Sequence, residues 1–282
     1  MKQVKFKGTT LNLIGRNIKK GDFAPDFVVV SSELEEISLR EFEDKIKVIT
    51  SFPSLDTPVC DLQVREFNKR ASDLGDDIIV LGISKDLPFA QKRFCEASNI
   101  KNIFLFSDYR YSSFSINYGL LIKELNLVAR SALIVDKNNV VRYFQTVEEI
   151  TESVNYQDIL ENIKMVLENP VAGMKSDNTL KCEPCETGIP PLTKEKIDKL
   201  LAGCPGWVLI EDKRIVKEFK FKSFVESNLF VDILAVVAEE QGHHPTISIQ
   251  YNKVKIILTT HASKGLTPND FIMAKIIDDL KI

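Results

Sequence analysis

Two continuous apolar runs, separated by a helical pattern, constrain the fold of this chain more than any other feature. The runs are KIKVITSF at residues 45–52 and DIIVLGIS at residues 77–84. Each is short and rich in β-branched residues, which is typical of a strand buried on both faces. Between them, apolar residues recur every three to four positions and predict a helix from about Thr57 to Leu74. A strand, a helix and a second strand in succession predict a parallel or mixed α/β sheet.

Further segments of the first part repeat this alternation of strand and helix patterns. In chain order they predict a hairpin at 4–15, a strand at 26–32, a short Ser-capped helix at 38–44, a helix at 87–98, a strand at 102–107, a helix at 112–122, a hairpin at 131–145 and a helix capped by Asn155. The regular spacing of these elements supports one α/β domain over residues 1–170.

Residues 171–191 interrupt the pattern. They are rich in Gly, Pro, Ser and charged residues and show neither a helical nor a strand period, which is typical of a linker between domains. Residues 192–282 then predict helices at 193–203, 223–240 and 267–280 and strand pairs at 207–221 and 246–260. A small α+β domain is expected there, in which an antiparallel sheet packs on helices.

Composition excludes several classes of protein. The net charge is −3 and no Lys/Arg run occurs, so we do not expect nucleic-acid binding. The first residues lack the apolar core of a signal peptide, and no run of about 18 apolar residues predicts a membrane span. We therefore expect a cytoplasmic protein. Five irregularly spaced cysteines in a reducing compartment indicate catalysis, redox exchange or metal binding rather than structural disulfides.

Cys60 lies one turn into the predicted helix after the first apolar run. The first turn of a helix has unpaired N–H groups and a partial positive charge, which favour a thiolate. Thr57 is placed to hydrogen-bond the sulfur, and Pro53 and Pro58 stiffen the approach to it. Position alone leaves two interpretations open: a reactive thiolate, or a small buried hydrophobic residue, which is the commoner fate of an unbridged cysteine.

Three segments carry a resemblance that addresses this choice. They are FPSLDTPVCD at 52–61, DLPFAQKRFC at 86–95 and ARSALIVD at 129–136. Together they resemble the thiol peroxidase branch of the peroxiredoxins, of the atypical two-cysteine type. The resemblance covers about residues 1–168 and implies a thioredoxin-like fold for this α/β domain.

The resemblance also implies an active site formed by Pro53, Thr57, Cys60 and Arg130. In it, Cys60 is the peroxidatic cysteine and Cys95 the resolving one. Without the motif, Cys95 would be read as a core residue of its helix and Arg130 as a surface charge.

The chemistry that this resemblance implies needs no metal or haem. A thiolate attacks the O–O bond of a hydroperoxide and becomes a sulfenic acid. Arg130, with Thr57, stabilises the charge on the thiolate and on the departing oxygen. Because Cys95 lies on another predicted helix, we expect helix ends to unwind before it condenses with Cys60. Thioredoxin, an external dithiol protein, would then reduce the disulfide.

All three histidines fall in the last quarter of the chain, at His243, His244 and His261. Pro245 ends any helix at once, so the adjacent pair is expected on a loop. With a turn at residues 251–253, the following hairpin would bring position 261 roughly opposite 243 and gather three imidazoles. Zinc is one possible ligand, but adjacent histidines seldom bind one metal together and no fixed carboxylate or cysteine completes the set. Proton transfer near neutral pH suits imidazole better.

Two segments of this region resemble pterin-4a-carbinolamine dehydratase, a family also known as a dimerisation cofactor. They are EEQGHHP at 239–245 and YNKVKIILTTHASKGLTPND at 251–270, and GCPGWVLI with Trp207 resembles the family's entry to its first strand. The resemblance spans about residues 180–282. The matching positions are Glu239, His243, His244, Pro245, Tyr251, His261 and Asp270.

This second resemblance implies dehydration of a pterin substrate, 4a-hydroxytetrahydrobiopterin, to the quinonoid dihydropterin. His243, His244 and His261 would be the catalytic set. Glu239 either orients an imidazole or is an exposed carboxylate at a helix end, and Asp270, like Tyr251, belongs to the signature and is open to a structural role.

Cys182 and Cys185 form a CxxC in the predicted linker, with Cys204 the nearest further thiol. One CxxC is half of a tetrahedral zinc site, so zinc, a redox pair and no defined role all stay open.

The whole chain is expected to be a bifunctional enzyme that requires no cofactor and forms a homodimer or larger homo-oligomer. The rival interpretation is a peroxide sensor fused to a non-catalytic dimerisation module.

Overall fold

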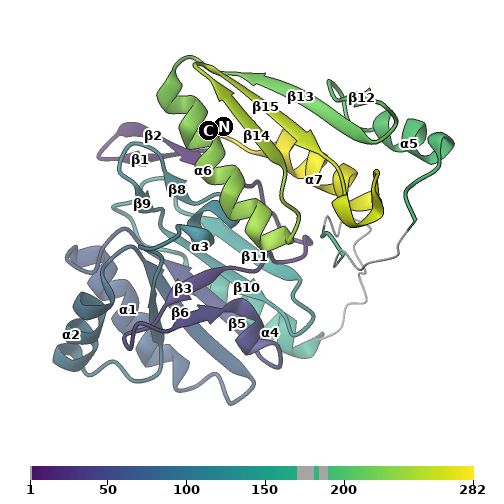
Figure 1. Ribbon diagram of the computed structural model, residues 1–282. Helices are drawn as coiled ribbons and strands as arrows, with labels where there is room; N and C mark the ends of the chain where they lie inside the picture. Colours follow the sequence, from purple (N-terminus) through teal and green to yellow (C-terminus); the bar gives the residue numbers. More distant parts are fainter. Residues whose placement is uncertain (1, 170–180, 184–189) are drawn as a thin grey trace. The chain divides into compact units, whose positions relative to one another are not determined.

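The chain divides into two compact units, Met1–Thr179 with Lys281 and Leu180–Leu280 with Ile282 (Figure 1). The computed structural model describes residues 2–169, 181–183 and 190–282. Most of the predicted linker at 171–191, including Cys185, lies outside the described residues, so the predicted domain boundaries stay a prediction.

A seven-stranded mixed sheet forms the centre of the first unit. Its order is β11 (Val141–Thr146), β10 (Ser131–Val135), β5 (Ile46–Ser51), β6 (Ile78–Ser84), β7 (Phe104–Ser107), β3 (Val28–Val30) and β4 (Glu36–Ser38). The two apolar runs form β5 and β6, which pair in parallel at the middle of the sheet. Every residue of β5 is buried, as predicted for a strand covered on both faces.

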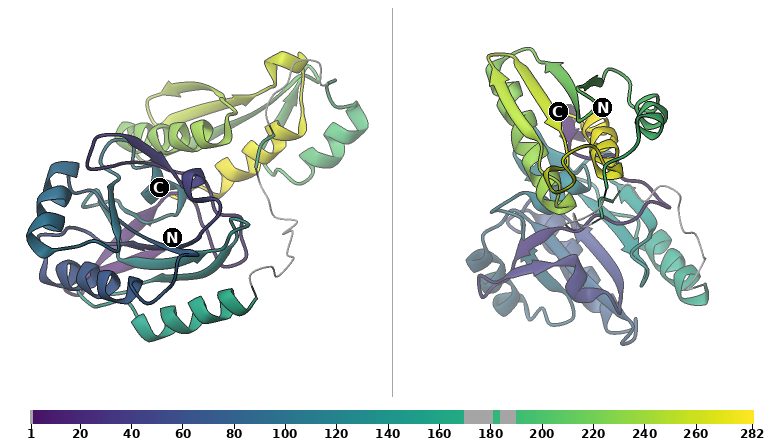
Figure 2. Two further views of the ribbon diagram at one scale, coloured as in Figure 1. Left: turned by 90° about the horizontal axis from the view of Figure 1, so that it is seen from below. Right: turned by 45° about the vertical axis from the view of Figure 1, so that its right-hand side comes forward.

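Helices and a second small sheet cover the two faces of this sheet (Figure 2). The elements are α1 (Pro58–Ala71), α2 (Pro88–Ser98), α3 (Ser113–Asn117) and α4 (Tyr156–Glu168), with the strands β1 (Gln3–Phe6), β2 (Thr9–Ile14), β8 (Leu121–Ile122) and β9 (Leu127–Val128). Val48 of β5 packs in the cluster that α1 and α4 share. Its neighbour Ile49 packs in the cluster of α3 and the β1–β2 hairpin. This alternation places the two layers on opposite faces of the sheet.

The helix predicted at 112–122 is wrong in extent, because α3 ends at Asn117 and the chain continues as β8. Gly119 has φ +62°, and a Cβ there would lie 2.0 Å from the carbonyl oxygen of Arg16. A positive φ at such a close approach ends the helix. At its other end, the buried Asp108 carboxylate accepts the N–H groups of Phe114 and Ser115, both at 3.0 Å. The short strands β4, β8 and β9 were not predicted.

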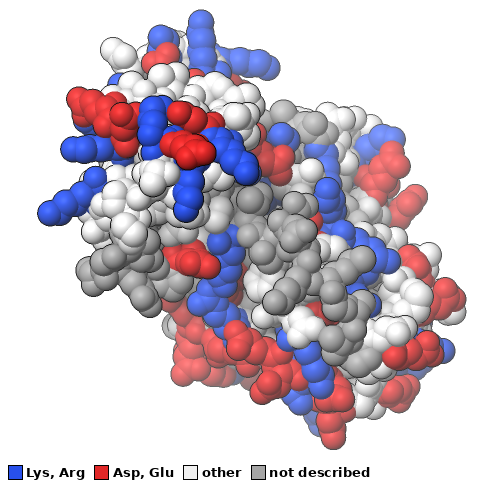
Figure 3. Space-filling view, turned by 90° about the vertical axis from the view of Figure 1, so that its right-hand side faces the viewer, with Lys and Arg blue, Asp and Glu red and all other residues white. Residues whose placement is uncertain are grey.

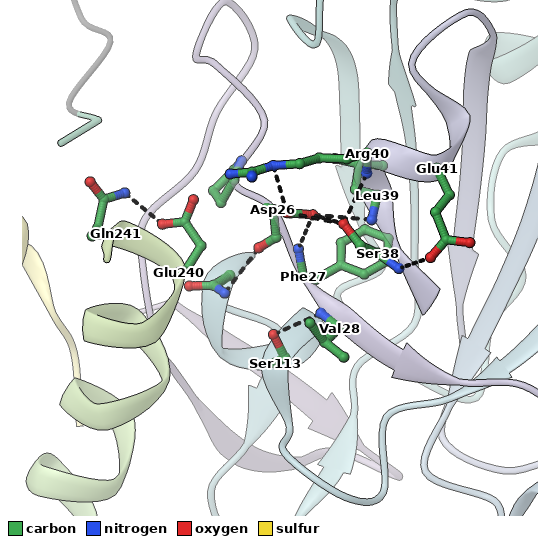
Figure 4. Close-up of polar contacts among 12 residues, drawn as sticks. Asp26, Phe27, Val28, Ser38, Leu39, Arg40, Glu41, Ser113, Glu240 and Gln241 are labelled. Carbon is green, nitrogen blue, oxygen red and sulfur yellow. Dashed lines mark hydrogen bonds and ion pairs between the residues drawn. The ribbon is translucent and has the colours of Figure 1, made fainter. Parts of the chain in front are cut away.

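The Ser38 cap was predicted and is present, on the 3-10 helix Leu39–Phe42 (Figure 4). The Ser38 hydroxyl accepts the N–H of Arg40 and donates to the Asp26 carboxylate at 2.9 Å. Asp26 also accepts the N–H of Leu39 and pairs with the Arg40 guanidinium at 2.9 Å. One carboxylate thus links the residues before β3 to the end of β4 and the start of the 3-10 helix.

The second unit is a four-stranded antiparallel sheet with helices. The strand order is β12 (Val208–Ile210), β13 (Arg214–Lys220), β15 (Lys253–Leu258) and β14 (Thr246–Gln250), and the helices are α5 (Lys194–Leu201), α6 (Phe224–Gln241) and α7 (Pro268–Asp279). Both α6 and α7 contact β15, and their apolar residues are buried with Val254, Ile256 and Leu258 of that strand. The predicted α+β class is correct.

Ser223 and Gly242 define the ends of α6. The Ser223 hydroxyl accepts the N–H of Glu226, and Gly242 adopts φ +61° and turns the chain out of the helix. The fixed end of α6 therefore sets where the chain begins the loop that carries His243 and His244.

No helix within residues 2–169, 181–183 and 190–282 combines the length and apolar character needed to cross a bilayer. Basic and acidic side chains are interspersed over the face shown in Figure 3.

Candidate active sites

Cys60 is fully buried in the first turn of α1, at the carboxyl end of β5. Thr57, the N-cap residue, donates its hydroxyl hydrogen to the Cys60 sulfur at 2.8 Å. Arg130 Nη2 lies 3.3 Å from the same sulfur, although 70 positions separate the two residues in sequence. Two donors, one of them a cation, therefore converge on a buried sulfur, which is an arrangement that stabilises a thiolate.

Arg130 is held in a network of buried acceptors. It is 1% exposed, and its Nε donates to the carbonyl oxygen of Ile150 at 3.0 Å. Its Nη1 donates to Gln63 Oε1. Gln63 Nε2 in turn donates to Thr50 Oγ1 at 2.5 Å. Every arm of the guanidinium is occupied, so its direction toward the sulfur is fixed.

The loop that enters α1 is anchored by Asp86, which follows β6. The Asp86 carboxylate accepts the Ser54 hydroxyl at 2.7 Å and the N–H of Leu55 at 2.8 Å. Pro53, before these residues, is buried. Since β5 and β6 are parallel neighbours, their carboxyl ends meet at one sheet edge and place Asp86 beside the loop.

Cys95 lies on α2 and is half-buried against the same hydrophobic cluster that contains Cys60. Neither cysteine is in a disulfide. Burial, with the nearby Glu96 carboxylate, raises the pKa of the Cys95 thiol. The folded arrangement thus keeps Cys95 protonated and on a different helix from Cys60.

The second site is centred on a buried imidazole–carboxylate pair. His243 is 4% exposed, and its Nε2 lies 2.9 Å from Oδ1 of Asp270, which is fully buried. The other oxygen, Oδ2, accepts the hydroxyl of Thr260 at 2.9 Å and the N–H of Thr267 at 2.7 Å. Asp270 is the third residue of α7 and closes its capping box with Thr267. The same carboxylate thus begins a helix and orients an imidazole.

His244 is paired differently. Its Nε2 lies 3.1 Å from Oε1 of Glu239, in the last turn of α6, and both side chains are exposed, at 60% and 79%. Glu239 is thus an exposed carboxylate at a helix end that contacts an imidazole, and its role in orienting that imidazole stays a prediction.

The register of the β14–β15 hairpin differs from the predicted one. Gln250 pairs with Lys253, so the turn comprises residues 251 and 252 rather than 251–253. Continued to the strand ends, this register puts position 260, and not 261, opposite His243. A shift of one residue exchanges the side chain presented at that point.

Thr260 therefore takes the place predicted for His261. Thr260 is buried and bonded to Asp270, whereas His261 is exposed at the start of the 3-10 helix His261–Ser263. The structure joins His243 to Asp270 and His244 to Glu239, and it leaves the His261 side chain on the surface beside Thr260.

Two other signature residues are remote from this pair or serve packing. Tyr251 is 69% exposed at the hairpin turn, which is the opposite end of β14 from His243. Trp207 is buried, and its Nε1 donates to Asp278 of α7 at 3.1 Å. Asp278 also pairs with Lys217 at 2.6 Å.

Two of the remaining cysteines are buried in the second unit. Cys182 lies against α7, with its sulfur 3.6 Å from the carbonyl oxygen of Asn269, and Cys204 lies 4.0 Å from that of Phe271. Burial raises the pKa of the Cys204 thiol. Among the described residues, no three His, Cys, Asp or Glu side chains are grouped as ligands for a metal ion.

Comparison with known proteins matches each unit to a family. The family model described as Redoxin matches residues 19–160, which is half of the chain. The chain belongs to the redoxin family. A second model, pterin 4 alpha carbinolamine dehydratase, matches residues 190–280. The molecule is thus a fusion of a redoxin domain with a pterin dehydratase domain.

Relatives of the redoxin domain are thiol peroxidases. That of Clostridium acetobutylicum is 47% identical over 159 residues, which are 56% of this chain and 96% of that protein. That of Bacillus subtilis is 44% identical over 167 residues, 59% of this chain and 99% of the relative. The crystal structure of a peroxiredoxin-like protein from Aquifex aeolicus is 40% identical, covers 59% of this chain and 98% of that one, and has a TM-score of 0.56. The first domain therefore has the thioredoxin-like peroxiredoxin fold and is a thiol peroxidase domain.

Three residues of the two sites were not predicted from the sequence. Gln63 lies one turn after Cys60 on the same helical face, and this spacing was the available signal. Asp86 follows the second apolar run at a sheet edge shared with the first, which parallel pairing could have indicated. Thr260 could not be identified from the sequence, because a three-residue turn places residue 261 rather than 260 opposite His243. The catalytic roles of the residues that the sequence did predict at the two sites stay predictions.

Proposed function

We propose that the redoxin domain reduces hydrogen peroxide and organic hydroperoxides through a Cys60–Cys95 disulfide cycle. The observation that carries this proposal is the pair of contacts to the buried Cys60 sulfur, from Thr57 at 2.8 Å and Arg130 at 3.3 Å. The thiolate attacks one peroxide oxygen, the O–O bond breaks, and Cys60 becomes a sulfenic acid. The second oxygen leaves as an alkoxide or hydroxide, which the same two donors stabilise until it is protonated.

The sulfenic acid then condenses with the Cys95 thiol, which releases water and forms the disulfide. Because Cys60 is fully buried and Cys95 belongs to α2, the first turn of α1, the α2 segment or both must unwind for the sulfurs to meet. Thioredoxin reduces the disulfide by thiol exchange and returns both cysteines to thiols. This cycle fits a cytoplasmic protein.

Stopped-flow peroxide consumption with thioredoxin and its reductase tests this cycle. Sustained turnover by wild type, with a single oxidation and no recycling in Cys95→Ser, is the expected result. If wild type is itself oxidised once and not recycled, the domain is a sensor rather than a peroxidase.

We propose that the second domain dehydrates 4a-hydroxytetrahydrobiopterin to the quinonoid dihydropterin. Support comes from the His243–Asp270 pair at 2.9 Å and from the matched family model. Loss of water needs an acid at the departing C4a hydroxyl and a base at a ring N–H. His243, fixed by a buried carboxylate, and the exposed His244 and His261 are the groups proposed to share these tasks.

The test is water loss from the synthetic carbinolamine, followed by absorbance, with His243→Ala as the variant. A fall in rate of about 10²-fold or more is expected from the usual contribution of acid–base catalysis. Equal rates in both proteins would remove the assignment to His243, and a wild-type rate no higher than that of the uncatalysed reaction would favour a non-catalytic dimerisation module.

A further inference from the structure

Cys182 and Glu183, from the segment between the two family matches, bind directly to the pterin dehydratase domain. The N–H of Cys182 donates to Gln241 Oε1 at 2.7 Å. Asn269 forms a two-way contact with the backbone of Glu183. It accepts the Glu183 N–H on Oδ1 at 3.0 Å and donates from Nδ2 to the Glu183 carbonyl oxygen at 2.7 Å. Gln241, Asn269 and Cys182 are all buried.

The two side chains that hold this segment lie next to the imidazole–carboxylate pair. Gln241 is the last residue of α6, two positions before His243, and Asn269 is the second residue of α7, directly before Asp270. The segment therefore bridges the end of one helix and the start of the other. Those are the two elements whose separation sets the 2.9 Å contact between His243 and Asp270.

We propose that residues 182 and 183, through Gln241 and Asn269, position the His243–Asp270 pair for the dehydratase reaction. This inference rests on the proposed function of that site. Gln241 and Asn269 are positioning residues, since they act through their neighbours and not on the pterin. The segment contributes backbone N–H and C=O groups to these three bonds, so this role does not depend on thiol chemistry.

The physical reason is that catalysis is sensitive to small displacements of a catalytic group. A shift of about 1 Å costs on the order of 10²-fold in rate. Gly242, with its positive φ, lies between Gln241 and His243, so the chain leaves the helix at a residue without a side chain of its own to pack. The bond from Cys182 to Gln241 holds the helix end on one side of this glycine and thereby limits where the imidazole goes.

The test compares Gln241→Ala and Asn269→Ala with wild type in the full-length chain. We expect kcat for dehydration to fall about tenfold in each variant, with KM changed less than about twofold, because the loss is in positioning and not in pterin binding. The pH profile of kcat should be displaced, because the contact between the His243 imidazole and the Asp270 carboxylate no longer keeps its wild-type geometry. Lys275→Ala, an exposed position on α7, is the matched control and should keep wild-type kcat and profile.

A second measurement separates this proposal from the proposed function. The NMR signal of the His243 ring reports its contact with Asp270 whether or not the domain is a dehydratase. A shifted ring signal in both alanine variants supports positioning even if wild type has no activity. Unchanged kcat, pH profile and ring signal in both variants overturn it. If Asn269→Ala unfolds the domain, as seen in Trp207 fluorescence, Gln241→Ala decides, because it removes only one bond to the segment.

Cys182→Ser identifies which part of the residue matters. The backbone N–H survives this change, so kcat should fall much less than in Gln241→Ala. A loss as large as that of Gln241→Ala would show that the sulfur itself acts, and would overturn the assignment to the backbone.

Discussion

The cysteine site and the histidine site differ in how far their side chains are buried and held by other residues. In the first domain, Arg130 contacts the Cys60 sulfur, is held by further buried partners and is 1% exposed. In the second, His243 is the one histidine that is buried and held by a buried carboxylate, whereas His244 and its partner Glu239 are exposed. The first site is thus enclosed by buried partners, whereas the second combines one buried imidazole–carboxylate pair with one exposed pair.

This difference has an energetic consequence. Contacts to the sulfur act in a medium from which water is excluded, so each is worth more than an exposed one. The exposed His244–Glu239 pair competes with water and contributes on the order of 0–1 kcal/mol. Substitutions should therefore have larger effects at the first site than at the second.

The largest expected effect is that of Cys60→Ser. A serine hydroxyl is not ionised at neutral pH and does not form a sulfenic acid, so peroxidase activity should fall by more than about 10³-fold. Peroxide consumption and carbinolamine dehydration are measured on one sample. Dehydratase activity should stay at the wild-type level, and a parallel loss of both activities would contradict the independence of the two sites.

Arg130→Lys should have the next largest effect. A lysine cannot bond Ile150, Gln63 and the sulfur at once, because it lacks the planar fork of the guanidinium. Loss of one oriented donor to the developing charge typically costs about 10²–10³-fold, and kcat/KM for peroxide should fall by that amount. Arg142→Lys, at the pair with Asp136 in which the two side chains are 18% and 2% exposed, is the control and should leave kcat/KM unchanged.

The pH dependence of stability should also differ between the domains. Burial raises the pKa of Asp108, in the first domain, from 3.8 to about 6. The folded domain then binds this proton more tightly than the unfolded chain. The resulting stabilisation is present below about pH 4 and is lost as the pH rises through 6. Two pH units correspond to about 3 kcal/mol in the free energy of unfolding.

Urea unfolding between pH 4 and 7 checks this prediction. Circular dichroism follows the whole chain, and the single tryptophan, Trp207, follows the second domain alone. In Asp108→Asn the first domain should lose this part of its pH dependence, while the Trp207 transition should match wild type. The same slope in wild type and variant would show that Asp108 does not titrate in this range.

The smallest effect is expected within the histidine site. Asp270→Asn should lower dehydration about 10- to 100-fold, since His243 keeps its place but loses the carboxylate that orients it. Glu239→Gln should cost less than about threefold, because that pair is exposed. Dehydration rates of the two variants rank the pairs directly. A larger loss in Glu239→Gln would make the exposed pair the catalytic one and reverse the comparison.

The sequence was most informative where one short motif carries the geometry. The apolar runs predicted β5 and β6, and the spacing from Thr57 to Cys60 predicted a hydrogen bond that depends only on the first turn of a helix. Arg130 was connected to this site through a resemblance, since no local pattern relates residues 70 positions apart.

The sequence was least informative where one residue of register decides the outcome. Both a two-residue and a three-residue turn fit the residues around Asn252, and the choice exchanges Thr260 for His261 beside Asp270. In the same way, only a contact between distant segments, the approach of Gly119 to the backbone of Arg16, shortens α3. Such contacts leave no periodic trace in the chain.

In the proposed cycle, the complete burial of the Cys60 sulfur would make the folded first domain selective by size. A protein reductant would reach the sulfur only after the helix end unwinds, so oxidation and reduction would use different conformations of the same helix end. Reductant would then be consumed only after a peroxide has reacted.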